Sequence, residues 1–201
     1  MNNFVQLIID KYYDICQENT FEKGQVIFNE GNPCNELTIV LNGEILISTI
    51  TYNEKEETIN VIKDCDIFGD ILCNATNNIY LGDVICQKKT KVLILSKDKL
   101  MKLLLSDSDL LDSYLTLISD KTLDIKLQAK LFSHKRIDDR IMYYLSLKAI
   151  NNLVFIDSVT ELAKALSLPR PSVSRTLSDL ESSGLITRDN KFIYIKKTID
   201  Q

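Results

Sequence analysis

A cluster of arginine and serine side chains near the C-terminus has the residue types and spacing needed for contacts with DNA. Arg170, Ser174 and Ser178 are four residues apart, which places them on one face of a helix, and Pro171 and Arg175 lie beside them. In the major groove an arginine can donate two hydrogen bonds to O6 and N7 of guanine, a match worth about 1 to 3 kcal/mol of discrimination. Arg170 and Arg175 are therefore the candidate base contacts.

Short hydroxyls add to this surface. Ser172 and Ser174 lie near the predicted helix start, where exposed main-chain amides favour anions, so they suit a phosphate oxygen or a base edge. The sequence predicts seven DNA-contacting residues: Arg170, Ser172, Ser174, Arg175, Ser178, Arg188 and Lys191. The alternative is a small helical domain whose serines and arginines are merely solvated.

Two predicted helices position these residues. Ser158-Val-Thr-Glu161 has the form of a capping box and predicts the start of the first helix, with Leu162, Ala165 and Leu166 on its apolar face. Ser167-Leu168-Pro169 breaks that pattern. A second helix can start near Pro171, because proline in a first turn has no hydrogen bond to lose.

The second helix and the segment after it complete a winged helix-turn-helix over residues 157–197. The helix turns Val173, Leu177 and Leu180 inward at helical spacing and ends at Gly184. Two alternating segments, 185–188 and 191–195, then flank Asp189-Asn190, a pair that tolerates positive φ. The pattern predicts a hairpin, the wing, with Arg188 and Lys191 at its tip.

Charge is distributed in agreement with this assignment. The net charge is −4, but residues 134–201 carry 11 Lys and Arg against 8 Asp and Glu, whereas residues 1–133 carry 13 against 20. The basic excess lies where DNA contacts are predicted. Because no apolar run is long enough to cross a bilayer and the N-terminus lacks a signal-peptide pattern, we expect a cytoplasmic protein with no membrane partner.

The five cysteines lie in the first half, without a C-x-x-C pair: Cys16, Cys34, Cys65, Cys73 and Cys86. An odd number without close spacing argues against a disulfide framework and a four-thiolate metal site. Buried free thiols are the simplest interpretation, and a redox-sensing thiol is the alternative.

The first half of the chain predicts a β-roll. After an amphipathic helix around residues 5–16, strands at 37–41 and 44–48 flank Asn42-Gly43, a strong hairpin signal. Further strands are expected at 58–62, 82–86 and 91–96. Short antiparallel strands at this spacing indicate an antiparallel β-roll of the jelly-roll type.

Three glycine motifs of this half resemble a known family. Residues 21–33 (FEKGQVIFNEGNP), 41–45 (LNGEI) and 66–70 (DIFGD) resemble the cyclic-nucleotide-binding domain of the Crp/Fnr superfamily. With the winged motif, the resemblance covers nearly the whole chain. It implies a bacterial transcription regulator that acts as a homodimer on a double-stranded DNA operator, with RNA polymerase as a further partner.

The same resemblance places the effector pocket at Phe68, Gly69, Asp70, Tyr80 and Leu81. Members that bind cyclic AMP use a Gly-Glu pair for the ribose and an arginine about ten residues later for the phosphate. Here the corresponding positions hold Gly69-Asp70 and Tyr80-Leu81, and no arginine precedes Arg136. Because a buried phosphodiester needs a paired cation, the sequence argues against cyclic AMP and cyclic GMP.

No cofactor, metal site or catalytic constellation is predicted. The N-terminus lacks the clustered cysteines that hold an iron–sulfur cluster, and His134, the only histidine, lies outside the roll. Haem bound through His134 and a small-molecule effector are the alternatives. No phosphate loop or nucleophile elbow is present, so an enzyme is not expected.

A long helix without glycine or proline is predicted between residues 107 and 133. Its apolar positions follow a strict 4-3 spacing and form a predicted dimer seam: Leu111, Leu115, Ile118, Thr122, Ile125, Ala129 and Phe132. Such a seam fits a two-stranded coiled coil, and a dimer is favoured because a two-fold pair of recognition helices could meet half-sites about 34 to 36 Å apart, one turn of duplex. The alternative is a helix packed only on its own roll.

The sequence therefore predicts an α+β protein with three segments: a sensor roll at 1–106, a dimerisation helix at 107–134 and a winged helix-turn-helix at 135–201. The predicted function is sequence-specific regulation of transcription, controlled by a signal other than cyclic AMP. Its alternatives are control by a cyclic nucleotide, control by redox state or haem, and constitutive DNA binding with a ligand-free roll.

Overall fold

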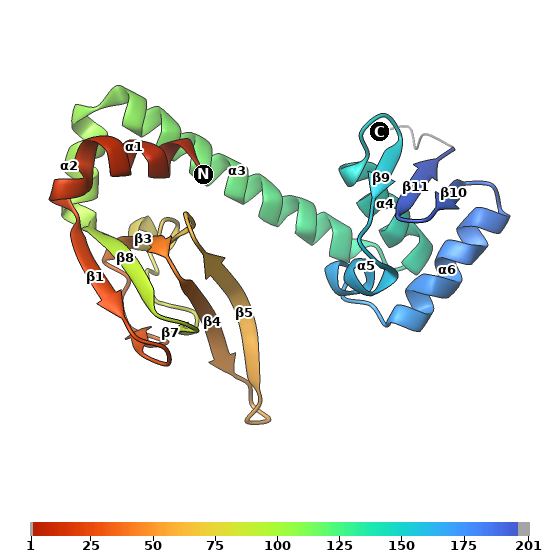
Figure 1. Cartoon of the computed structure of the whole chain (residues 1–201), viewed down its shortest axis with the longest axis horizontal. Helices are drawn as coiled ribbons and strands as arrows, with labels where there is room; N and C mark the ends of the chain where they lie inside the picture. Colours follow the sequence, from red (N-terminus) through yellow and green to blue (C-terminus); the bar gives the residue numbers. More distant parts are fainter. Residues whose placement is uncertain (1, 197–201) are drawn as a thin grey trace. The chain divides into compact units, whose positions relative to one another are not determined.

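The computed structural model describes residues 2–196, and the chain divides into two compact units between Lys121 and Thr122 (Figure 1). The long helix α3, Ser108–Ser133, continues across this division, and each unit has its own hydrophobic core. Within the described residues every helix is too short or too polar to span a bilayer. The predicted fold class, an antiparallel roll followed by a long helix and a winged helix-turn-helix, is confirmed.

The N-terminal unit contains two four-stranded antiparallel sheets, with strand orders β1-β8-β3-β6 and β2-β7-β4-β5. Their strands are β1 (Gln17–Phe21), β2 (Val26–Phe28), β3 (Glu36–Asn42), β4 (Glu44–Ile50), β5 (Glu56–Lys63), β6 (Ile67–Phe68), β7 (Asp83–Cys86) and β8 (Thr90–Ser96). β3 and β8 supply much of the core of this unit, in which Leu37, Ile39 and Leu93 are fully buried. This arrangement is the predicted roll.

The hairpin predicted at Asn42-Gly43 is wrong. β3 pairs with β8 and β6, whereas β4 pairs with β5 and β7, so the chain passes from one sheet to the other at this point. Gly43 has φ +140°, and a Cβ there would lie 2.4 Å from Oγ1 of Thr90. Glycine is required at this close approach to β8, because a Cβ at residue 43 would overlap the Thr90 side chain.

Helices close one end of the roll (Figure 1). α1 (Asn3–Tyr12) begins where the Asn2 side chain accepts the amide of Phe4 at 2.8 Å, and it continues into a 3₁₀ turn, η1 (Tyr13–Ile15). α1 buries Phe4, Val5 and Ile8, and a second 3₁₀ turn, η2 (Leu72–Asn74), follows β6. α2 (Lys97–Ser106) then leads to α3.

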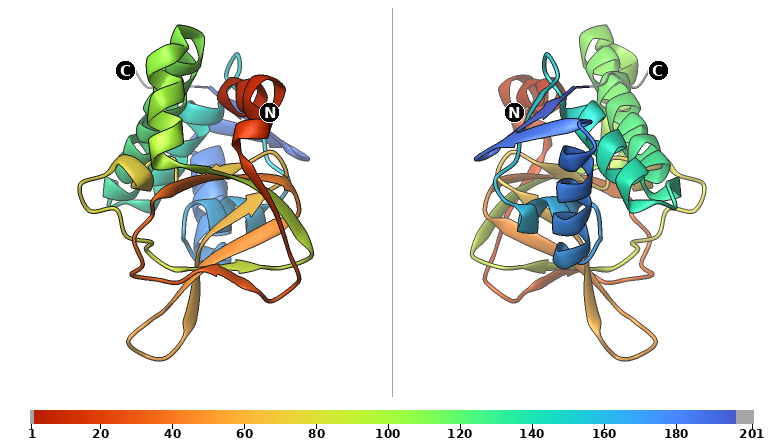
Figure 2. Two further views of the ribbon diagram at one scale, coloured as in Figure 1. Left: turned by 90° about the vertical axis from the view of Figure 1, so that its left-hand side faces the viewer. Right: turned by 90° about the vertical axis from the view of Figure 1, so that its right-hand side faces the viewer.

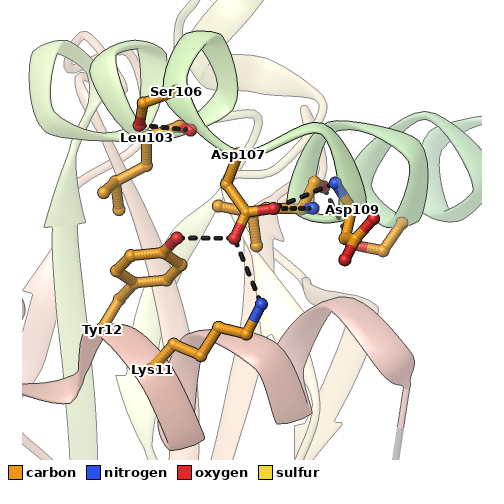
Figure 3. Close-up of polar contacts among 8 residues, drawn as sticks. Lys11, Tyr12, Leu103, Ser106, Asp107 and Asp109 are labelled. Carbon is orange, nitrogen blue, oxygen red and sulfur yellow. Dashed lines mark hydrogen bonds and ion pairs between the residues drawn. The ribbon is translucent and has the colours of Figure 1, made fainter.

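Asp107, between α2 and α3, joins the beginning of the long helix to α1 (Figure 3). Its Oδ2 accepts the Tyr12 hydroxyl at 2.6 Å and lies 3.3 Å from Nζ of Lys11. Its Oδ1 accepts the amides of Asp109 and Leu110, which caps α3. The hydrogen bond from Tyr12, followed by that from the Leu110 amide, lowers the pKa of Asp107 to about 2.

The C-terminal unit packs three helices against a small sheet (Figure 2). The helices are α4 (Ile137–Lys148), α5 (Val159–Ala165) and α6 (Arg170–Ser182). The sheet has strand order β10-β11-β9, from β10 (Ile186–Asp189), β11 (Phe192–Ile195) and β9 (Leu153–Phe155). β9 was not predicted, and it makes the wing a three-stranded sheet instead of an isolated hairpin.

The Asp107 cluster predicts how stability depends on pH. The pKa of this carboxyl is depressed in the folded protein, so its stabilising effect is present above its ordinary pKa of 3.8 and is lost as pH falls towards about 2. We expect Asp107→Ala to lower the free energy of unfolding at pH 7. Urea unfolding monitored between pH 7 and pH 2 should show the difference from wild type shrinking below about pH 4. A constant difference across that range would contradict this role for the charge.

Candidate nucleic-acid interface

The first helix of the predicted motif begins as its sequence indicates. Ser158 precedes α5, and its hydroxyl accepts the amide of Glu161 at 3.1 Å. In a full capping box the Glu161 carboxylate would accept the main-chain amide of Ser158. Here that carboxylate pairs with Lys164 at 2.9 Å instead. The predicted apolar face needs one correction. Ala163 is buried beside Leu162 and Leu166, whereas Ala165 is exposed.

The turn between the two helices reverses the chain within a few residues. Ser167 has φ +50°, and the amide of Leu168 donates to the Ala163 carbonyl at 3.0 Å. α6 then starts at Arg170 with Pro171 in its first turn, as predicted. Its inner face is confirmed as well, because Val173, Leu177 and Leu180 lie in the core.

The opposite face of α6 presents two arginines that have no side-chain partner among residues 2–196. The whole chain contains five arginines, and three of them are held by other groups. Arg136 pairs with Asp138 at 2.5 Å, Arg188 pairs with Glu181 at 2.7 Å, and Arg140 donates to main-chain carbonyls. Within residues 2–196, Arg170 and Arg175 are exposed, and their guanidinium groups form neither an ion pair nor a hydrogen bond.

Arg140 joins three parts of the C-terminal unit. Its guanidinium donates to the carbonyls of His134 at 2.8 and 3.2 Å, of Phe132 at 3.4 Å and of Leu166 at 3.5 Å. These acceptors end α3 and α5, where helix carbonyls lack partners inside the helix. Arg140 therefore ties the end of the long helix to the turn that precedes α6. Sequence spacing gave no indication of this role.

The wing differs from its predicted geometry by one residue. Asp189 pairs with Phe192, so the loop is Asn190-Lys191, with Asn190 at φ +52°. Lys191 lies in that loop, 3.9 Å from Asp157 and over the ring of Phe155. Arg188 does not lie at the tip. It is inside β10, opposite Ile193.

The serines also differ from one another in their surroundings. Ser172 is half-buried and Ser174 is exposed, and both lie in the first turns of α6 as predicted. Ser178 is exposed, but its hydroxyl donates to the Ser174 carbonyl at 3.2 Å and accepts from Nη2 of Arg188 at 3.3 Å. The predicted contacts are thus two arginines that lack a partner within the described part of the chain, two serines, one wing lysine and two residues with internal bonds.

The predicted effector residues do not line a single exposed surface. Phe68 and Tyr80 are buried, and the ring of Phe28 lies between them, stacked on Tyr80 at 4.6 Å and edge-on to Phe68 at 6.2 Å. The Tyr80 hydroxyl is 3.5 Å from Glu36. Leu81, in contrast, is 61% exposed. Aromatic rings therefore pack against one another where the resemblance places a ligand phosphate.

Gly69 and Asp70 have internal structural roles. Gly69 has φ +78°, and a Cβ there would lie 2.5 Å from the Glu36 carbonyl oxygen. The Asp70 side chain is only 5% exposed and lies 2.6 Å from Nζ of Lys121, and its carbonyl accepts the Tyr114 hydroxyl at 2.8 Å. Lys121 and Tyr114 belong to α3, so the predicted effector motif is attached to the long helix.

Comparisons with known proteins agree with both units. A family model described as a cyclic nucleotide-binding domain matches residues 18–107, and one described as a Crp-like helix-turn-helix domain matches residues 142–198. An anaerobic regulatory protein of Bacillus subtilis (strain 168) is 27% identical over 186 residues, which cover 87% of this chain and 77% of that protein.

Two solved structures share the fold. The catabolite activator protein of Thermus thermophilus has a TM-score of 0.57 at 19% identity, covering 94% of this chain and 89% of that one. A mutant of CooA from Carboxydothermus hydrogenoformans has a TM-score of 0.59 at 16% identity, covering 97% of this chain and 92% of that one. At these identities the likeness concerns the fold alone.

The geometry predicts different consequences for two cationic side chains. Arg170→Ala should weaken binding to the preferred duplex by about 1 to 3 kcal/mol and relax the preference at one base pair per half-site. Lys191→Ala should weaken binding to all duplexes similarly and lower the slope of log K against log salt by about 0.9 for each phosphate that is no longer neutralised. Fluorescence anisotropy with selected and scrambled duplexes measures both. Equal effects of the two changes on every duplex would refute this division.

Proposed function

A chain that combines a cyclic nucleotide-binding domain with a Crp-like helix-turn-helix domain is a member of the Crp/Fnr superfamily of transcription regulators, and we propose that this member binds its operator as a homodimer. One observation carries the proposal for the DNA-binding surface. Both arginines that lack internal partners within the described residues project from the exposed face of α6. Their guanidinium groups are free to donate to a guanine or a phosphate, whereas those of Arg136, Arg140 and Arg188 already donate to groups of the chain.

The proposed homodimer rests on the two apolar faces of α3. One face, with Leu110, Tyr114 and Leu117, is buried in the core of the N-terminal unit. Most of the predicted seam lies on another face and is exposed in the single chain, including Leu111, Leu115, Ile125 and Phe132. From Thr122 to Lys130 no residue is buried. A second copy of the helix would cover this stripe, since apolar side chains at a 4-3 spacing are buried when two helices form a coiled coil.

The proposed signal is one other than cyclic AMP. A cyclic nucleotide would have to place its phosphate near Tyr80, where aromatic rings are packed and no arginine is available. Lys121 of α3 contacts the effector motif, but it is already paired with Asp70. A small molecule could instead act on the contact between Asp70 and α3, which would alter how the long helix is held. RNA polymerase, the further partner expected from the sequence, belongs to this proposal as well.

The redox and haem alternatives receive less support. Burial raises the pKa of the Cys73 thiol to about 11, and burial also raises the pKa of Cys34 and of Cys86. These thiols are therefore protonated at neutral pH, and the reactive form of cysteine is the thiolate. His134 lies in the C-terminal unit with its ring 4.8 Å from that of Tyr143. Constitutive DNA binding is the second candidate, because the roll's aromatic stack can be a scaffold without a ligand.

A pair of leucine variants tests the dimer. Leu115→Asp places a charge in the predicted seam, so we expect a monomer in sedimentation equilibrium and a loss of DNA affinity of roughly a hundredfold or more. The matched control is Leu105→Asp on α2, where an 83% exposed leucine lies outside the seam and the dimer should persist. A wild-type monomer, or a Leu115→Asp protein that remains dimeric, would contradict the proposed seam.

Thermal unfolding with added cyclic AMP tests the proposed signal. A ligand at a hundred times its dissociation constant stabilises the folded state by about 2.7 kcal/mol, which is readily measured. We expect no change in Tm up to millimolar cyclic AMP, and no change in operator affinity. A saturable rise in Tm with cyclic AMP would show that the filled aromatic region rearranges to accept the nucleotide, and the proposal would be wrong.

A further inference from the structure

We propose that Arg188, Glu181 and Ser178 form a clamp that fixes the wing to the recognition helix α6, and that Arg188 is a positioning residue and makes no contact with phosphate. This inference rests on the proposed DNA-binding function and deepens it. It also replaces the sequence-based expectation that Arg188 and Ser178 contact DNA directly. We call the set Arg188, Glu181 and Ser178 the wing clamp.

The first observation is the number of bonds that converge on one carboxylate. Nε and Nη2 of Arg188 donate to Oε2 of Glu181 at 2.9 and 2.7 Å. The main-chain amide of Arg188 donates to Oε1 at 2.9 Å. Both carboxylate oxygens are therefore bonded to the same residue of β10, through its side chain and through its main chain. Such a geometry fixes the position of the strand as well as the charge.

The second observation is where that amide lies in the sheet. β10 is an edge strand, because the strand order is β10-β11-β9. Amides on the outer side of an edge strand have no strand partner and need another acceptor. Glu181 supplies that acceptor from the last turn of α6. The strand that leads to the wing loop is thus paired with β11 on one side and with the recognition helix on the other.

The third observation concerns Ser178. Its hydroxyl is engaged by Nη2 of Arg188 at 3.3 Å and by the Ser174 carbonyl at 3.2 Å. Ser178 lies about one turn before Glu181 on α6, so the guanidinium is held at two points along the helix. A serine with its hydroxyl committed in this way is less available for a base edge than Ser174 is. The wing clamp therefore links the base-contacting helix to the loop that carries Lys191.

The negative charge of Glu181 makes the direction of the change in DNA affinity a test of the clamp. Glu181 is a carboxylate on the recognition helix, and an unneutralised carboxylate would repel DNA phosphates. The main-chain amide and then the guanidinium of Arg188 hold the pKa of Glu181 below its usual range, so the group stays ionised and paired. If Glu181 had no positioning role, its removal would leave Arg188 free and strengthen DNA binding. If the clamp positions the wing, its removal weakens binding even though a negative charge has gone.

The experiment measures affinity and salt dependence of full-length variants. The probes are the duplex of about 30 base pairs that wild type most enriches from a random pool, and a scrambled duplex of equal length. For Glu181→Ala and Arg188→Ala we expect about fivefold weaker binding to the selected duplex, within the range of a partly exposed ion pair. The salt slope should stay at its wild-type value for Arg188→Ala, because Lys191 still neutralises its phosphate and the loss of affinity comes from ordering a released wing. The double variant should be no weaker than either single one.

Two further variants separate the clamp from simple charge effects. Asp179→Ala removes an exposed carboxylate from the same helix, and within residues 2–196 that side chain has neither an ion pair nor a hydrogen bond, so binding should be equal or tighter. Arg188→Lys keeps the charge but has no planar guanidinium with two nitrogens to donate to Glu181. Its DNA affinity should therefore lie between those of Arg188→Ala and wild type. Tighter binding by Glu181→Ala, or a salt slope lowered by about 0.9 or more in Arg188→Ala, would overturn the proposal.

Amide hydrogen exchange tests the clamp without DNA. Glu181→Ala should accelerate exchange at the Arg188 amide about fivefold or more, because that amide loses its acceptor, whereas Asp179→Ala should leave it unchanged. Unchanged exchange in Glu181→Ala would overturn the clamp even if DNA binding fell. Failure of wild type to bind any duplex would contradict the proposed function, while the exchange result would still decide whether the clamp exists.

Discussion

The structure depends on one helix that must bury apolar side chains on more than one face. α3 packs Leu110, Tyr114 and Leu117 into the core of the N-terminal unit and Leu131 into the core of the C-terminal unit. A separate apolar stripe, including Leu115 and Ile125, is left to water in the single chain. A helix that is apolar on several faces is stable only when each face is covered. The proposed dimer follows from this requirement, and so does the symmetry of the proposed DNA complex.

Polar contacts at the two ends of α3 connect this helix to the two sites. Near its start, Asp107 fixes α3 to α1, and further along Lys121 and Tyr114 hold the loop at Asp70. At its far end, Arg140 donates to the carbonyls of Phe132 in α3 and of His134 just after it, and to the carbonyl of Leu166, which immediately precedes the turn before α6. A change at the Asp70 loop therefore bears on the same helix whose end is bonded to the DNA-binding motif. The proposed regulation depends on contacts of α3 within the N-terminal unit and on other contacts of α3 within the C-terminal unit.

Local sequence signals predicted the C-terminal unit well and the roll less well. Ser158, Pro171 and Gly184 act on their own neighbours, so helix starts and ends followed from residue type, and the helical period identified Val173, Leu177 and Leu180 as core. Asn42-Gly43 predicts only that the chain turns. Whether the two strands pair is decided by β8, much later in the chain, and that choice is absent from local sequence. The sequence likewise did not predict the partner of Arg188. Glu181 lies in α6 and Arg188 in β10, and they meet only because the chain turns back at Gly184.

The central claim is that two copies of α3 pair and present two sets of Arg170 and Arg175 to successive major grooves. Methylation interference at guanine N7, on a duplex selected by the wild-type protein, tests this most directly. The account predicts two symmetric clusters of interfering guanines whose centres are about 10 to 10.5 base pairs apart, one turn of the duplex. A single cluster, or no interference at guanine N7 on a duplex that the protein binds, would contradict it.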